Sequence, residues 1–108
     1  MIKSINDKLV TFTAYANPST ATDTAVVAAV PNHKIVVHAV FTVAAGANSV
    51  YFKSDSTALT GTSALAANGG LVLPFNENGW FKTAVGQALN FTTSAAVATG
   101  VTVVYSLE

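Results

Sequence analysis

Two histidines, His33 and His38, are the side chains in this sequence best suited to metal binding or to proton transfer near neutral pH. They lie five residues apart, and on an unbroken strand an odd spacing places two side chains on opposite faces. A metal ion bound by both would require a different arrangement and a nearby carboxylate. We therefore interpret His33 as a turn residue and His38 as a residue of a sheet or of a subunit interface, and we expect no metal site.

Paired carboxylates and activated hydroxyls are the other groups that could perform catalysis. The five carboxylates are far apart in sequence: Asp7, Asp23, Asp55, Glu77 and Glu108. Serine and threonine are abundant, but the G-x-S-x-G motif of a nucleophile elbow does not occur. Cysteine is absent, which excludes thiolate ligands and cysteine nucleophiles. We expect no catalytic residues and no enzymatic activity.

The segment 76–79, Asn-Glu-Asn-Gly, presents several oxygen atoms, which are the ligands that calcium prefers. It lacks the D-x-[DN]-x-[DN]-G spacing of a calcium-binding loop, and its composition is typical of a plain turn. No glycine-rich loop that could bind a phosphate is present. We expect no cofactor.

Trp80 and Phe81, together with Tyr51 and the nearby Asn76 and Asn78, suggest a platform for sugar binding. Aromatic rings stack on the apolar faces of sugars, and amides bond to their hydroxyl groups. The same aromatic side chains bury large areas when they serve as core residues or as anchors of an interface. Both interpretations remain open at this point, and we favour the anchor.

Five lysines balance five carboxylates, and arginine is absent, so the chain has no net charge. Charged residues are also sparse and make up 9% of the chain. Average globular proteins contain about 25%. A neutral chain without a basic cluster is a poor partner for nucleic acid. The longest apolar region, residues 25–45, is interrupted by Pro31 and Lys34, so we expect no membrane partner. A free monomer with so little charge would be poorly soluble, so we expect copies of the chain to pack against each other.

Segments rich in Val, Thr, Phe and Tyr alternate with clusters of Asn, Asp, Gly, Pro and Ser, which is typical of strands joined by turns. About eight strands predict an all-β, antiparallel β-sandwich or jelly roll, with a small barrel as the alternative. The 108 residues have room for one such domain, which we assign to residues 9–108. Residues 46–48 are expected to form a hairpin connection. The expected strands are 9–16, 24–30, 34–44, 49–54, 71–75, 80–83, 88–93 and 101–107.

The third of these strands, residues 34–44, is apolar on both of its faces. Simple alternation assigns one face to the core, namely Ile35, Val37, Ala39, Phe41 and Val43. The centre of the opposite face consists of Val36, His38 and Val40. A strand that is apolar on both faces is usually covered on both sides. We therefore predict that Val36, His38 and Val40 lie in a subunit interface.

The first eight residues combine the apolar Ile2 and Ile5 with Lys3 and other charges. We predict that residues 1–8 form an N-terminal arm that adds to a neighbouring sheet or to a protein shell, because exposed strand edges recruit extra strands. The alternative is a frayed terminus.

Three segments carry a resemblance to a known class of proteins: FKSDSTALTG at residues 52–61, LAANGGLVLPFN at 65–76 and GWFKTAVGQALN at 79–90. They resemble small β-sandwich proteins encoded by tailed bacteriophages, of the decoration (capsid cement) and accessory virion type. The resemblance implies a homotrimer on the exterior of the capsid that clamps the major capsid protein, without catalytic residues. It does not separate a capsid protein from a tail or fibre component. The alternative function is a carbohydrate-binding module of a phage tail tip or adhesin.

Overall fold

The computed structural model describes residues 9–108, so the predicted arm with Ile2, Lys3 and Ile5 lies outside the described residues. Ten strands and no helix occur in this range. Three non-glycine residues adopt a positive φ, namely Asn32, Asp55 and Asn68, and each lies in a predicted turn cluster, as expected for side chains that tolerate this conformation. The strands are β1 (Phe12–Ala16), β2 (Asp23–Val27), β3 (Ile35–Ala44), β4 (Asn48–Ser54), β5 (Thr57–Ala58), β6 (Ser63–Leu65), β7 (Gly70–Leu73), β8 (Phe81–Lys82), β9 (Leu89–Thr93) and β10 (Thr99–Leu107).

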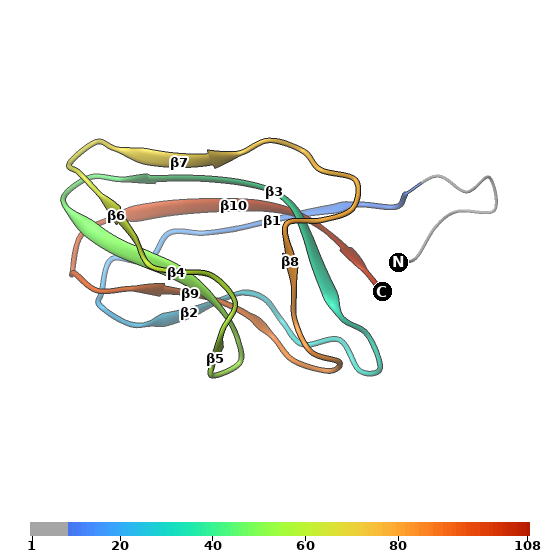
Figure 1. Cartoon of the computed structure of the whole chain (residues 1–108). Helices are drawn as coiled ribbons and strands as arrows, with labels where there is room; N and C mark the ends of the chain where they lie inside the picture. Colours follow the sequence, from blue (N-terminus) through green and yellow to red (C-terminus); the bar gives the residue numbers. More distant parts are fainter. Residues whose placement is uncertain (1–8) are drawn as a thin grey trace.

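The strands form two antiparallel sheets that face each other, so the predicted β-sandwich is confirmed (Figure 1). The upper sheet has the order β1-β10-β3-β7, with β8 also paired to β3. The lower sheet has the order β2-β9-β4-β5, with β6 also paired to β4. The hairpin predicted at residues 46–48 is wrong, because β3 and β4 belong to different sheets. Their connection crosses between the layers, where Ala45 N donates a hydrogen bond to Ala98 O.

The core lies between the two sheets and consists of side chains that point inward from alternate strand positions. Three phenylalanines link the layers: the ring of Phe52 lies 5.1 Å from the rings of both Phe81 and Phe91. Ile35, Val37 and Leu89 are fully buried around them. Burial of aromatic and branched side chains supplies the main stabilisation of such a sandwich.

A β-bulge in β3 changes which of its residues face the core. Val104 of β10 lies opposite Ala39, but the next residue, Tyr105, lies opposite Val37, so His38 is an extra residue on the bulged strand. A shift by one residue exchanges the two faces of a strand. Ile35 and Val37 face the core before the bulge, whereas Val40, Thr42 and Ala44 are buried after it and Phe41 and Val43 are exposed. The assignment of Phe41 and Val43 to the core is therefore wrong.

Candidate functional site

Most of the exposed large apolar side chains of the described residues lie on the outer side of the upper sheet. One row of side chains crosses this sheet, because Tyr15 lies opposite Thr102, Thr102 opposite Phe41, and Phe41 opposite Val72. Tyr15 is 71% exposed and Val72 is 63% exposed. We define the apolar face as the set of exposed side chains on this side of the molecule, namely Tyr15, Phe41, Val43, Val72 and Phe75.

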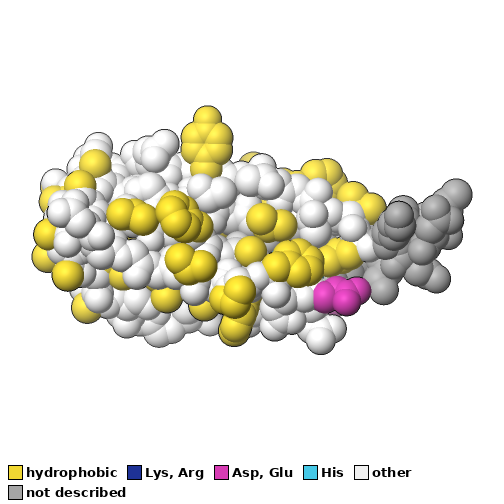
Figure 2. Space-filling model, turned by 90° about the horizontal axis from the view of Figure 1, so that it is seen from above, with side chains coloured by type: hydrophobic (Ala, Val, Ile, Leu, Met, Phe, Trp, Pro, Cys, Tyr) yellow, Lys and Arg dark blue, Asp and Glu magenta, His cyan; other side chains and the backbone are white. Residues whose placement is uncertain are grey.

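The apolar face has almost no charge. Figure 2 looks down on the upper sheet and shows apolar side chains gathered over it, with the acidic colour only at the end beside the undescribed residues. A groove of about 270 Å³ runs across this face between Phe41, Val72 and Phe75, and no charged side chain lines it. Contiguous apolar surface of this kind is typical of sites that bind a protein, a membrane or a ligand.

A segment of the chain, residues 74–80, packs over the bulged part of β3. Asn76 N donates a hydrogen bond to His38 O at 2.9 Å, and Trp80 N donates to Val37 O at 2.8 Å. His38 Nδ1 lies 2.8 Å from Asn76 O and Nε2 lies 2.7 Å from Ser106 Oγ. Because a carbonyl oxygen only accepts, Nδ1 carries the proton, and Nε2 accepts from the serine hydroxyl in the neutral ring. His38 is therefore a structural residue with both ring nitrogens occupied.

The subunit interface predicted at Val36, His38 and Val40 is wrong at these three residues. Their exposed fractions are 2%, 0% and 2% within the single chain. Segment 74–80 covers the outer side of β3 at Val36 and His38. Val40 points into the core because the bulge at His38 has reversed the faces of the strand.

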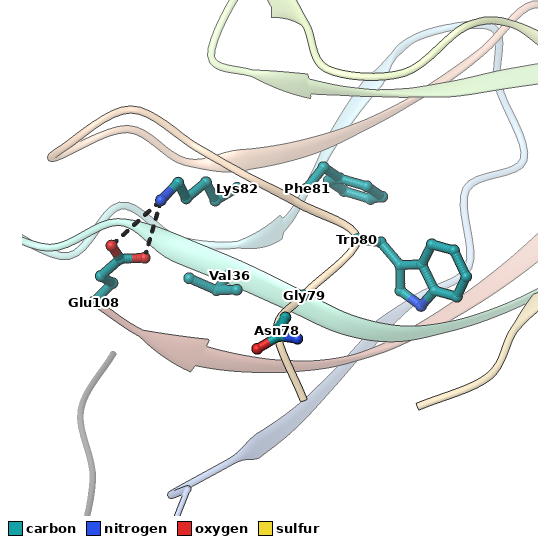
Figure 3. A pocket seen from close by; sticks show the side chains of 7 residues that line it. All are labelled: Val36, Asn78, Gly79, Trp80, Phe81, Lys82 and Glu108. Carbon is teal, nitrogen blue, oxygen red and sulfur yellow. Dashed lines mark hydrogen bonds and ion pairs between the residues drawn. The ribbon is translucent and has the colours of Figure 1, made fainter. Parts of the chain in front are cut away.

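Trp80 stands at the end of segment 74–80 and is 44% exposed. Its indole Nε1 donates a hydrogen bond to Pro74 O at 2.8 Å, which ties the two ends of the segment together. A cavity of about 380 Å³ adjoins Trp80, and an ion pair of 3.3 Å between Lys82 Nζ and Glu108 Oε1 lies on its far side (Figure 3). The indole ring points away from this ion pair.

The predicted aromatic platform of Trp80, Phe81 and Tyr51 is not assembled. Phe81 lies opposite Val37 in the ladder and packs its ring on Phe52 in the core. Tyr51 belongs to the lower sheet, where Lys53 Nζ lies 5.4 Å from the centre of its ring, and it does not line the cavity beside Trp80. Trp80 is therefore the one member of the predicted set that the structure leaves available as an exposed anchor.

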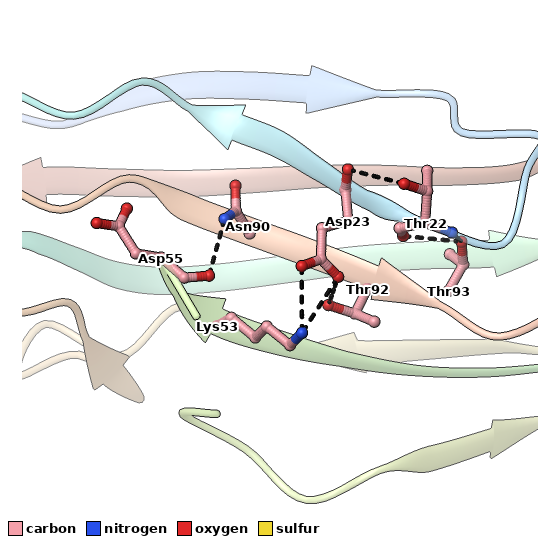
Figure 4. A network of polar contacts seen from close by, with 7 residues as sticks. All are labelled: Thr22, Asp23, Lys53, Asp55, Asn90, Thr92 and Thr93. Atoms are coloured by element: carbon pink, nitrogen blue, oxygen red, sulfur yellow. Dashed lines mark hydrogen bonds and ion pairs between the residues drawn. The ribbon is translucent and has the colours of Figure 1, made fainter. Parts of the chain in front are cut away.

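The outer side of the lower sheet is polar (Figure 4). Asp23 accepts a hydrogen bond of 2.7 Å from Thr92 Oγ1 and forms an ion pair of 3.1 Å with Lys53. The hydrogen bond from Thr92, together with the contact to Lys53, lowers the pKa of Asp23 below its ordinary value. The same contact raises the pKa of Lys53. Asp23 is thus held as a charged structural group, which is unsuited to act as a general acid.

The remaining candidates for chemistry are dispersed. His33 Nδ1 lies 2.9 Å from Pro31 O, beside the turn at Asn32, and shares no neighbour with the buried His38. Asn78 N donates to Asn76 Oδ1 at 3.0 Å, which makes this segment an Asx-type turn. Within residues 9–108, no group of three or more His, Cys, Asp or Glu side chains is placed to hold a metal ion. The same range contains no helix long and apolar enough to cross a membrane.

The sequence did not reveal the apolar face. Tyr15 and Phe75 carried no assignment, and Phe41 was assigned to the core. Residues 71–73 are all apolar, so no alternation in the sequence distinguished the outward Val72 from Leu71 and Leu73. Comparisons with models of protein families, with curated proteins and with solved structures find no match for this chain.

Proposed function

We propose that this chain is a structural protein of a bacteriophage virion, of the decoration or capsid cement type, which acts on the exterior of the capsid as a homo-oligomer. The apolar face is the observation that carries the proposal. A trimer follows from the resemblance of residues 52–90 to such proteins. A β-sandwich with a broad apolar face, and with no group of three potential metal ligands within residues 9–108, suits a protein that holds other proteins together.

The physical argument concerns the cost of leaving the apolar face in water. Removing apolar surface from water is favourable by a free energy of about 25 cal/mol per Å². Five large side chains, Tyr15, Phe41, Val43, Val72 and Phe75, contribute to the exposed surface. Because the groove between them has no charged lining, a matching partner surface must be uncharged too. A second copy of the chain offers such a surface, and the major capsid protein is the second partner that we propose.

The proposal is tested by the mass in solution, measured by light scattering after size exclusion over a concentration series. The wild-type chain should be a stable trimer. The double variant Phe41→Thr/Val72→Thr should dissociate at concentrations at least about tenfold higher, which for a trimer corresponds to about 2.7 kcal/mol per trimer, because its dissociation constant scales with the square of the concentration. Val85→Thr is the matched control, because Val85 is 57% exposed and lies in the turn between β8 and β9.

The capsid partner is tested by sedimentation with heads of the encoding phage from which this protein has been removed. The wild-type chain and Val85→Thr should bind and the double variant should not. A monomer at every concentration that also fails to bind such heads would refute the proposal.

A carbohydrate-binding module is the second candidate, and the cavity beside the exposed Trp80 is the observation that favours it. The separation of Tyr51 from that cavity speaks against an extended platform. A glycan array distinguishes the two functions. Sugar binding that is lost in Trp80→Ala would support the module, whereas no binding to any glycan by the wild-type chain would exclude it.

A further inference from the structure

The sandwich is open along one side, between β7 of the upper sheet and the segment 60–63 of the lower sheet. A slot of about 330 Å³ enters the core there. Its lining includes Val50 and Phe52, which are buried core residues, and Leu71 and Leu73 of β7. Protein interiors are normally packed without such spaces, so a slot lined by core side chains is unusual.

The lining of the slot defines the chemistry of its occupant. No charged side chain lines it, and a charged group placed there would lose its hydration without a partner. An enclosed apolar cavity of roughly 150 Å³ already binds a benzene-sized molecule. The slot therefore has room for one aromatic ring or one branched aliphatic side chain. Neutral residues with hydroxyl groups also line the slot, namely Thr42, Tyr51, Thr60, Thr62 and Ser63.

A second, independent feature lies beside the slot: β7 has one unpaired edge. It pairs with β3 on one side, and no described strand pairs with its other side. Ala44 N donates to Gly69 O across the ladder, so by alternation Gly70 and Val72 direct their backbone N–H and C=O groups to the open edge. Unpaired edge groups of this kind accept an additional strand.

We propose that the edge of β7 binds an extended segment of a protein partner, with one neutral, apolar side chain of that segment inserted into the slot. Strand addition couples the two features, because backbone hydrogen bonds supply affinity and a pocket for alternate side chains supplies specificity. A segment paired with Gly70 and Val72 would place every second side chain on the inner side of the sheet, where Leu71 and Leu73 form the side of the slot.

The binding is tested by NMR titration of the full chain with the end-blocked peptide Thr-Ser-Thr-Phe-Thr-Ser-Thr and with its matched version that carries a central lysine. The phenylalanine peptide should shift the amide signals of Gly70 and Val72 and the methyl signals of Leu71 and Leu73. The lysine peptide should bind at least about tenfold more weakly.

Two variants remove the two features separately. Gly61→Phe places a ring at the mouth of the slot, where an added Cβ meets nothing within 4 Å and the backbone has no positive φ. Val72→Pro removes an N–H that points to the open edge, where proline is tolerated. It also replaces one side chain of the apolar face, so the mass of this variant in solution is measured alongside. Each should weaken the binding of the phenylalanine peptide about tenfold or more. Val43→Thr, on the outer side of β3, should leave it unchanged and serves as the control.

The outcomes separate this proposal from others. Absence of shifts at Gly70 and Val72 with both peptides would refute it. Shifts of the Leu71 and Leu73 methyl signals with free indole, but with neither peptide, would also refute it and would assign the slot to a small molecule. Neither result bears on oligomer mass, because the self-association proposed above uses the apolar face.

Discussion

Gly79 is the residue of segment 74–80 whose lack of a side chain permits close packing on β3. A Cβ at this position would lie 2.5 Å from Val36 Cγ1, and the backbone has a φ of +84° that L side chains rarely adopt. The close approach lets the segment cover Val36 and hold the ring of His38 between Asn76 and Ser106. One glycine therefore lets the chain cover the outer side of β3 at Val36 and His38, while Phe41 and Val43 stay exposed.

Gly79→Ala should lower the free energy of unfolding by roughly 2–4 kcal/mol, since backbone strain and overpacking act together. Gly86→Ala is the matched control, because Gly86 also has a positive φ of 74° but its added Cβ meets nothing within 4 Å. It should cost roughly 1–2 kcal/mol from backbone strain alone. Urea-induced unfolding measures the free energy of unfolding of both variants. Equal losses would show that the contact of the added Cβ with Val36 does not destabilise Gly79→Ala.

At the scale of the elements, the bulge in β3 decides what each side of the upper sheet offers. It turns Val40 inward and Phe41 outward, which is the reverse of the simple alternation that begins at Ile35. Without the extra residue at His38, Phe41 and Val43 would face the core and the apolar face would lose its centre.

The phase of β3 is checked by comparing two neighbouring substitutions. Val40→Ala should lower the free energy of unfolding by about 2 kcal/mol, because it creates a cavity in the core. Phe41→Ala should change it by no more than about 0.5 kcal/mol, because its side chain is exposed. Urea unfolding should be measured over a range of protein concentrations in which the free energy of unfolding stays constant. A larger loss of unfolding free energy for Phe41→Ala than for Val40→Ala would contradict the bulge.

The strand pattern and the turns could be predicted from the sequence because they depend on local residue types. Each of the eight predicted segments contains a strand, although the short β5 and β6 were missed, since Ala64 and its neighbours favour no strand by composition. The bulge at His38 could not be predicted, because it arises from the register with β10, a partner distant in sequence. For the same reason the cover of Val36 by segment 74–80 was assigned to another subunit.

At the scale of the whole molecule, the two outer sides of the sandwich differ in chemistry. The upper sheet presents the apolar face, while the lower sheet presents the ion pair of Asp23 and Lys53 beside Thr92. Such a difference gives the molecule one side suited to a protein partner and one suited to water.

Self-association through the apolar face should persist or strengthen when the salt concentration rises. Apolar contacts do not depend on charge, whereas exposed ionic contacts are screened over about 3 Å at 1 M ionic strength. Sedimentation velocity at low and high sodium chloride concentration measures this directly. Dissociation by salt would instead indicate an interface built on the few charged residues.

The central place of β10 in the upper sheet has a consequence for the order of folding. β10 lies between β1 and β3, although it is the last strand along the sequence and β1 is the first. The upper sheet therefore cannot close while a growing chain lacks residues 99–107, and both strand pairings of β10 span a long stretch of sequence. Proteins dominated by such distant pairings fold slowly. Until β10 is in place, the edge of β3 that pairs with it has no partner strand.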